Sequence, residues 1–122
     1  MVKSILNQIE RVDVKTGVEN LTMYRLGVFE NKMYELVELN SGQYCPPHIH
    51  KNSESKILII KGSGEIILNG LSRPYALGSV FFVERGMIHG FKCKDQTLFL
   101  SIQTPPIIDT ATGEIDIEYF NK

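Results

Sequence analysis

Apolar and polar residues alternate along most of the chain, and turn-forming residues interrupt this alternation every few positions. A period of two is typical of strands that bury one face. Short strands bounded by turn signals indicate an all-β sandwich or barrel. We therefore predict an all-β fold, with strands expected in the segments 21–29, 33–39, 56–61, 65–68, 80–83, 87–93 and 97–103.

Glycine, asparagine and proline mark the expected turns. Asn69-Gly70 is a strong signal for a tight hairpin. The segment 62–64, Gly-Ser-Gly, separates two strand segments and predicts a second hairpin between them. Gly27 predicts a bulge inside the strand 21–29. The pair Pro105-Pro106 ends the last core strand, because neither residue can donate a hydrogen bond to a neighbouring strand.

The length of 122 residues predicts one domain over 1–122, with a core over about 20–104 and a C-terminal arm over 105–122. The arm contains the alternating segment 114–119, which predicts either an edge strand or an arm laid on a neighbouring subunit.

Charge and composition narrow the partners and the compartment. Thirteen basic and fourteen acidic residues nearly cancel, so no basic stripe is available for a nucleic-acid backbone. The longest aliphatic run, 57–60, is far too short to cross a membrane. The first residues do not resemble a signal peptide, and the spacing of Cys45 and Cys93 indicates two reduced thiols. These features favour a cytoplasmic protein.

A proline-rich stretch introduces the first candidate chemistry. Pro46-Pro47 favours an extended backbone, on which His48 and His50 point to the same face. Two convergent imidazoles supply half of a four-ligand site for a transition metal. The competing interpretation is an ordinary histidine pair in a surface loop. The choice depends on whether His89, the remaining histidine, reaches the other two.

Two spaced motifs resemble those of the cupin superfamily, whose small members are jelly-roll β-barrels. The first motif begins at Gly42, continues through His48 and His50, and ends at Glu54 and Gly62. The second places Gly78, Gly86 and His89 at the family's spacing. Glu84 and Cys93 stand where the family usually has a proline and an asparagine, which affects loop shape rather than metal binding.

The resemblance implies a fold of the double-stranded β-helix type and a divalent metal (zinc, manganese, iron, nickel or copper) bound by His48, His50 and His89. Glu54 is a candidate fourth ligand by its distance from the histidines, whereas counting back from Gly62 places Ser55 at the glutamate position. Strand alternation also favours Ser55 facing inward, since Glu54 inward would bury Lys56 as well.

Several other residues are candidates for the ligand pocket, with ordinary packing as the alternative for each: Gln43, Tyr44, Ser55, Phe82, Phe91 and Gln103. The resemblance implies a small polar or anionic metabolite as ligand. It implies an enzyme of the isomerase, decarboxylase or dioxygenase kind, or alternatively a non-catalytic binding or sensor protein. It also implies a homodimer.

Overall fold

The computed structural model describes residues 10–15, 20–108 and 111–119. These residues form strands joined by turns, and no helix occurs among them, so the predicted all-β class is confirmed. The strand bounds are β1 Glu10–Lys15, β2 Asn20–Phe29, β3 Lys32–Leu39, β4 Tyr44–Ile49, β5 Glu54–Lys61, β6 Gly64–Leu68, β7 Leu71–Tyr75, β8 Val80–Val83, β9 His89–Cys93, β10 Thr97–Thr104 and β11 Glu118–Tyr119.

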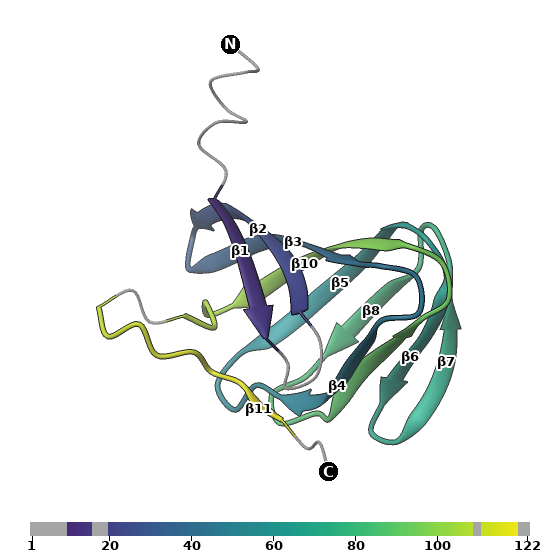
Figure 1. The fold of residues 1–122 in the computed structure, drawn as a ribbon. Helices are drawn as coiled ribbons and strands as arrows, with labels where there is room; N and C mark the ends of the chain where they lie inside the picture. The colour runs from purple at the N-terminus through teal and green to yellow at the C-terminus, as the bar shows by residue number, and fades with distance from the viewer. Residues whose placement is uncertain (1–9, 16–19, 109–110, 120–122) are drawn as a thin grey trace.

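The strands form two antiparallel sheets that face each other (Figure 1). One sheet has the order β1-β2-β3-β10-β5-β8, and the other has the order β11-β4-β9-β6-β7. The chain crosses between the sheets several times, which gives the jelly-roll barrel that the family resemblance implies. Paired sheets of this kind bury the inward side chains of both layers between them.

The hydrophobic core lies between the two sheets. Residues on β3, β5 and β10 alternate between buried and more exposed positions, as a half-buried strand requires. Phe91 stacks on Phe99 with ring centroids 4.7 Å apart, and Tyr75 packs edge-on against Phe91. Each such buried side chain contributes about 1.5–3 kcal/mol through the hydrophobic effect. Phe91 and Phe99 also line a cavity between the sheets.

The turn predictions have mixed outcomes. Asn69 and Gly70 have positive φ angles and join β6 to β7 as a hairpin, and the register of β2 shifts beside Gly27, so both predictions are confirmed. The predicted hairpin at 62–64 is wrong, because β5 and β6 belong to different sheets. Gly62 instead starts a crossover, and a side chain there would collide with Gln96 and Thr97.

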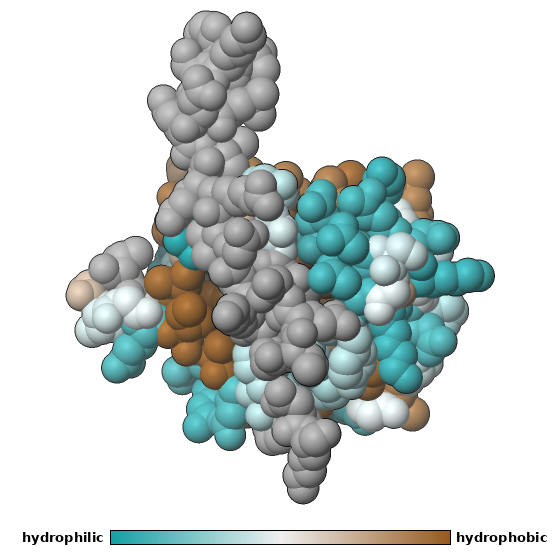
Figure 2. All heavy atoms as spheres, viewed as in Figure 1, coloured by the Kyte–Doolittle hydropathy of each residue, from teal (hydrophilic) through white to brown (hydrophobic). Residues whose placement is uncertain are grey.

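The C-terminal arm crosses the molecule from the end of β10 to the free edge of β4 (Figure 1). There β11 pairs with β4, with Tyr119 opposite His48. Hydrophobic atoms gather beside this arm, whereas hydrophilic atoms cover much of the other side of the same face (Figure 2). No described segment forms a helix with the length and hydrophobicity needed to cross a membrane.

Candidate metal centre

The three histidines come from two neighbouring strands and meet inside the barrel. His48 lies on β4 directly opposite His89 on β9, and His50 follows at the end of β4. The ring centroids of His48 and His89 are 4.1 Å apart, and those of His50 and His89 are 5.1 Å apart. The candidate ligand atoms of all three lie within 4.8 Å of one another. The structure therefore brings the three imidazoles close enough to coordinate one metal ion.

Local sequence explains how β4 presents its histidines. The pairing of β4 with β9 is irregular between Cys45 and His48, where the two prolines cannot donate to a ladder. The backbone of β9 approaches this irregular segment closely at Gly90, where a Cβ atom would lie 2.7 Å from the carbonyl oxygen of Cys45. Glycine at this position thus allows the strand carrying His89 to pack against the strand carrying His48.

Backbone carbonyl groups fix the tautomer of every ring. The Nδ1 atom lies 2.8 Å from the Pro46 oxygen in His48, 2.6 Å from the Asp116 oxygen in His50 and 3.0 Å from the Met87 oxygen in His89. A carbonyl oxygen can only accept, so each Nδ1 must carry the proton and donate it. Each Nε2 atom then retains its lone pair, which is the form that coordinates a metal.

Burial keeps this cluster uncharged. Burial, together with the smaller effect of the neighbouring histidines, lowers the pKa of His48 to about 3 and that of His89 to about 4. Burial also lowers the pKa of His50, although the Asp116 carbonyl and the charges of Asp116 and Glu35 oppose this shift. Three neutral imidazoles at neutral pH can offer lone pairs to a cation without first releasing protons.

Asp116, in the C-terminal arm, holds His50 and the two residues that follow it. Its carbonyl oxygen accepts the His50 proton, and its carboxylate accepts hydrogen bonds of 2.9 and 2.8 Å from the backbone N–H groups of Lys51 and Asn52. Tyr119 packs near His48, with ring centroids 5.3 Å apart, and burial raises its pKa to about 12. The arm thereby completes the surroundings of two of the three histidines.

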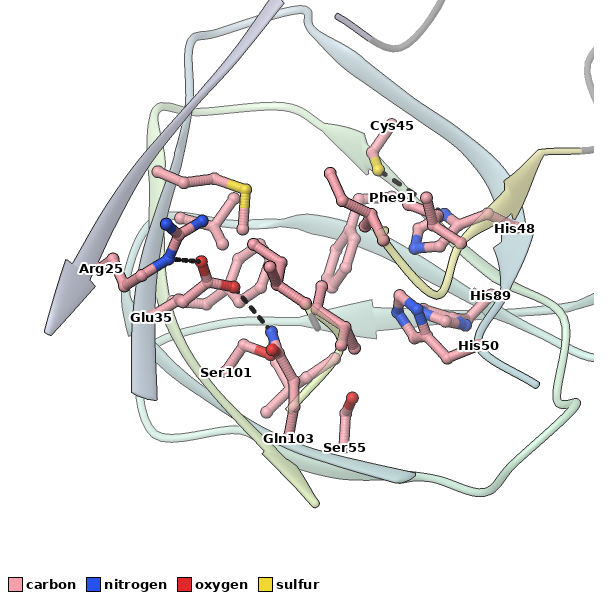
Figure 3. A pocket seen from close by; sticks show the side chains of 18 of the residues that line it. Arg25, Glu35, Cys45, His48, His50, Ser55, His89, Phe91, Ser101 and Gln103 are labelled. Carbon is pink, nitrogen blue, oxygen red and sulfur yellow. Dashed lines mark hydrogen bonds and ion pairs between the residues drawn. The ribbon is translucent and has the colours of Figure 1, made fainter. Parts of the chain in front are cut away.

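A cavity of about 240 Å³ opens beside the histidines (Figure 3). Most of its wall is apolar and comes from both sheets and from the arm, including Val37, Ile57, Phe91, Phe99, Ile107 and Ile117. Cavities with mostly apolar walls are typical of small-molecule sites. The described arm residues contribute several of these side chains, so the arm forms part of the cavity wall as well as of the histidine surroundings.

A buried polar group faces the histidines from the opposite sheet (Figure 3). Glu35 is fully buried; its carboxylate accepts a 2.9 Å hydrogen bond from Gln103 Nε2 and lies 3.4 Å from Arg25 Nε. Ser101 accepts a second hydrogen bond, of 3.1 Å, from Gln103 Nε2. Sequence reasoning missed Arg25 and Glu35 as site residues. Glu35 was detectable, because it occupies an inward position in the alternating strand 33–39.

The structure separates the predicted pocket residues into two groups. Ser55, Phe91 and Gln103 line the cavity. Gln43 and Tyr44 do not: Gln43 Oε1 accepts a hydrogen bond from the Asn40 backbone in a turn, and Tyr44 precedes the inward-facing Cys45 and so has the opposite orientation.

Glu54 and Phe82 also lie away from the histidines, in a separate depression on the outer face of the sheet. The cause is strand alternation: Ser55 and Val83 are the inward residues of their strands and pair with each other, so their neighbours point outward. Glu54 therefore does not join the three histidines as a ligand in this arrangement, and Phe82 is exposed rather than part of the cavity wall.

Comparisons with known proteins agree on one family. A family model described as "Cupin domain" matches residues 35–102, whereas no curated protein matches the sequence significantly. The matched residues include all three histidines together with Glu35 and Ser101.

Many solved structures are similar to this one. KdgF from Halomonas sp. is 20% identical over 81% of this chain and 90% of that one, with a TM-score of 0.71. A predicted oxalate decarboxylase from Thermotoga maritima is 20% identical over 81% of this chain and 95% of that one, with a TM-score of 0.72. The polyketide cyclase RemF from Streptomyces resistomycificus is 23% identical over 80% and 74%, with a TM-score of 0.69. These similarities establish the fold.

Proposed function

This chain belongs to the cupin family, and on that basis we propose that it is a metal-dependent enzyme whose substrate is a small organic anion. The metal is held by His48, His50 and His89. The observation that carries the proposal is the set of three carbonyl contacts that leave all three Nε2 lone pairs available within one buried cluster. Three protein ligands leave coordination positions for substrate, which is the arrangement of catalytic rather than structural sites.

The donor set fits a divalent first-row metal. Imidazoles bind zinc, manganese, iron, nickel and copper, so the identity of the metal does not follow from these ligands. A bound metal of this kind supplies Lewis-acid chemistry, polarising a carbonyl or carboxylate oxygen. Because the three histidines are neutral, they leave the charge of the cation uncompensated, which favours an anionic group on the substrate.

The cavity wall narrows the substrate class. The apolar side chains exclude water and so strengthen electrostatic interactions at the histidine end. Arg25, the cationic side chain of the described wall, already pairs with Glu35, which leaves little to neutralise a phosphate group. We therefore favour an oxo acid or enolate, with decarboxylation or oxygenation as the reaction, over a sugar phosphate. The name of the Thermotoga maritima relative is consistent with a carboxylate ligand.

Metal analysis is the first test of this function. Protein purified without chelators should contain about one equivalent of a transition metal, and His89→Ala should lower the metal affinity by more than about 100-fold. Glu54→Ala is the matched control: its carboxylate is close in sequence but lies on the outer face, so metal content should not change. A wild-type content below about a tenth of an equivalent would exclude a resident metal.

Turnover is the second test. The metal-loaded protein should convert at least one member of a panel of oxo acids, and His89→Ala should abolish this activity. Sugar phosphates serve as the comparison panel, and turnover of these compounds alone would contradict the proposed substrate class. An oxo acid that this protein converts should also slow the removal of the metal by chelators, because the acid occupies the remaining coordination positions.

A non-catalytic binding or sensor protein is the second candidate. Glu35 is the one carboxylate among the described residues of the cavity wall, and both Arg25 and Gln103 already contact it. No described carboxylate therefore stands unengaged beside the histidines to accept a proton. Metal-dependent ligand binding without turnover across both panels would favour this candidate.

Two expectations from the sequence stay predictions. The cytoplasmic location is one of them, and the homodimer is the other. The described part of the arm packs on its own β4 strand, so an exchanged arm would have to leave this position. The outer face of β5 and β8 exposes apolar side chains that suit a paired sheet face instead, namely Leu58, Ile60, Val80 and Phe82.

A further inference from the structure

The polar residues opposite the histidines form one continuous group across neighbouring strands. Glu35 pairs in register with Arg25 on β2 and with Ser101 on β10, and Gln103 on β10 pairs with Ser55 on β5. We call Arg25, Glu35, Ser55, Ser101 and Gln103 the polar wall. All five line the cavity, and they face the histidine cluster across it (Figure 3).

Glu35 determines how the Gln103 side chain is oriented. A carboxylate paired with arginine can only accept hydrogen bonds, so the Gln103 atom facing it must be the Nε2 donor. The second Nε2 proton goes to Ser101 Oγ. The amide nitrogen is therefore fully used, and the amide oxygen, Oε1, is left pointing away from both partners.

Two polar atoms of this wall have no partner among the described residues. They are Gln103 Oε1 and Ser55 Oγ, and both residues are only 3% exposed. Buried polar atoms are nearly always hydrogen-bonded, so an unpaired pair on adjacent strands calls for an explanation. Because both atoms belong to side chains that line the cavity, a group inside the cavity is the natural partner.

We propose that the polar wall recognises a hydroxyl group of the ligand. A hydroxyl can donate its proton to Gln103 Oε1 and accept the proton of Ser55 Oγ, so one group satisfies both atoms. A carboxylate has no proton to donate to Gln103 Oε1 and would add a second negative charge near Glu35. An ammonium group would bring an extra charge into an apolar cavity where Glu35 is already paired with Arg25.

The ligand then carries two different ends. This step depends on the proposed function, because the histidine end of the cavity takes an anionic oxygen group only when a metal is present. The polar wall takes the hydroxyl, and the apolar side chains between the two walls pack against a hydrocarbon segment. The geometry thus specifies a hydroxy acid: a carboxylate or enolate at one end and a hydroxyl at the other.

Matched pairs of small acids test the inference. Straight-chain ω-hydroxy acids of increasing length are titrated into the zinc-loaded protein by calorimetry, each beside the unsubstituted acid and the ω-amino acid of equal length. At the chain length that spans the cavity, the hydroxy acid should bind about tenfold more tightly than the unsubstituted acid. Equal affinities of the hydroxy acid and the unsubstituted acid at every length would show that only water bonds to Ser55 Oγ and Gln103 Oε1. Tighter binding of the ω-amino acid would show that the polar wall recognises an amine instead of a hydroxyl. Either result would overturn the proposal.

Serine variants assign the effect to the polar wall. Ser55→Ala should reduce the hydroxyl advantage to less than about threefold. Ser53→Ala should retain it, because this buried serine donates to the Pro105 carbonyl and does not line the cavity. Gln103→Met, which has similar volume, is the second variant and should also remove the advantage. A hydroxyl advantage that survives in both Ser55→Ala and Gln103→Met would overturn the inference.

Metal-free protein separates this inference from the proposed function. Primary alcohols are compared with their methyl ethers, which accept but cannot donate a hydrogen bond. Without metal the alcohol should still bind more tightly than the ether, and Ser55→Ala should remove the difference. If the alcohol binds more tightly than the ether but the protein binds no metal, the proposed metal function is wrong and the hydroxyl site is supported. If alcohol and ether bind equally while the protein binds metal normally, only the hydroxyl site is wrong.

Discussion

The two walls of the cavity orient their polar side chains in different ways. The three histidines come from β4 and the start of β9, and each is oriented by a backbone carbonyl group. The polar wall comes from four strands, and its side chains orient one another through Glu35. A side chain held by nearby backbone depends on local sequence, whereas a network held by side chains depends on strand register. We call His48, His50 and His89 the histidine wall. The carbonyl groups that orient His48 and His89 lie two residues away, so these orientations follow from local sequence. The orientation of His50 depends on the distant Asp116, so it is a product of the fold, as is that of the polar wall.

The two walls also differ in charge. Burial favours the neutral form of the histidines, so their wall carries lone pairs and no compensating charge. The polar wall contains a carboxylate and a guanidinium that contact each other. A cation is consequently favoured beside the histidines, whereas the polar wall does not require one. This contrast predicts that substitutions of the histidines act on metal binding. Substitutions in the polar wall should act on stability and on the choice of ligand.

The largest expected effect is on the polar wall. Glu35→Ala removes the acceptor of both Arg25 Nε and Gln103 Nε2 and leaves a cavity, so the free energy of unfolding should fall by about 3 kcal/mol. Zinc affinity should stay within about threefold of wild type, since Glu35 acts on the histidines only through its charge, the weakest of the influences on the pKa of His50. Glu38→Ala, on the opposite face of the same strand, is the matched control. Urea unfolding measures the stability and zinc titration measures the affinity. A loss of zinc binding with unchanged stability would contradict the assignment of Glu35 to stability rather than to metal binding.

Acid should act next, and on the histidine wall. In the unfolded chain both histidines have the ordinary pKa of 6.5, whereas in the folded chain the pKa is about 3 for His48 and about 4 for His89. Between these values the unfolded chain binds more protons than the folded chain. Stability of the metal-free protein should therefore fall as the pH falls through this window. His48 alone accounts for a loss of about 2 kcal/mol between about pH 7 and pH 5. His48→Phe should flatten the profile by that share in urea unfolding at each pH, and an unchanged slope would contradict the assignment.

The smallest effect is expected at the contact between the arm and the histidine wall. Asp116→Ala removes the acceptor of the Lys51 and Asn52 N–H groups, which loosens the carbonyl that orients His50. Zinc affinity should fall about tenfold, as is usual when a group that orients a metal ligand is disturbed. Glu114→Ala, an exposed acidic residue of the same arm, should have no effect. Competition with a chromophoric chelator measures both, and equal affinities would show that the arm does not support the site.

Strand prediction succeeded where local pattern and turn chemistry agree. The alternation in 33–39 and 97–103 and the glycine turn at Asn69-Gly70 each correspond to an observed strand or hairpin. The segment 62–64 misled because its glycines suit a hairpin as well as a crossover, and only the pairing partners of β5 and β6 distinguish the two. Phe82 misled for a related reason, since in the run of apolar residues 80–83 the sequence does not specify which face is inward.

The sequence by itself determined most of the strands, the spacing of the three histidines and the inward phase of Ser55, because each follows from relations between residues close in the chain. Only the tertiary structure decided that Asp116, far along the chain, orients His50, and that Arg25, Glu35 and Gln103 become neighbours. Those contacts depend on which strands pair and in what register. Long-range pairing minimises the free energy of the whole barrel, so no short stretch of sequence contains it.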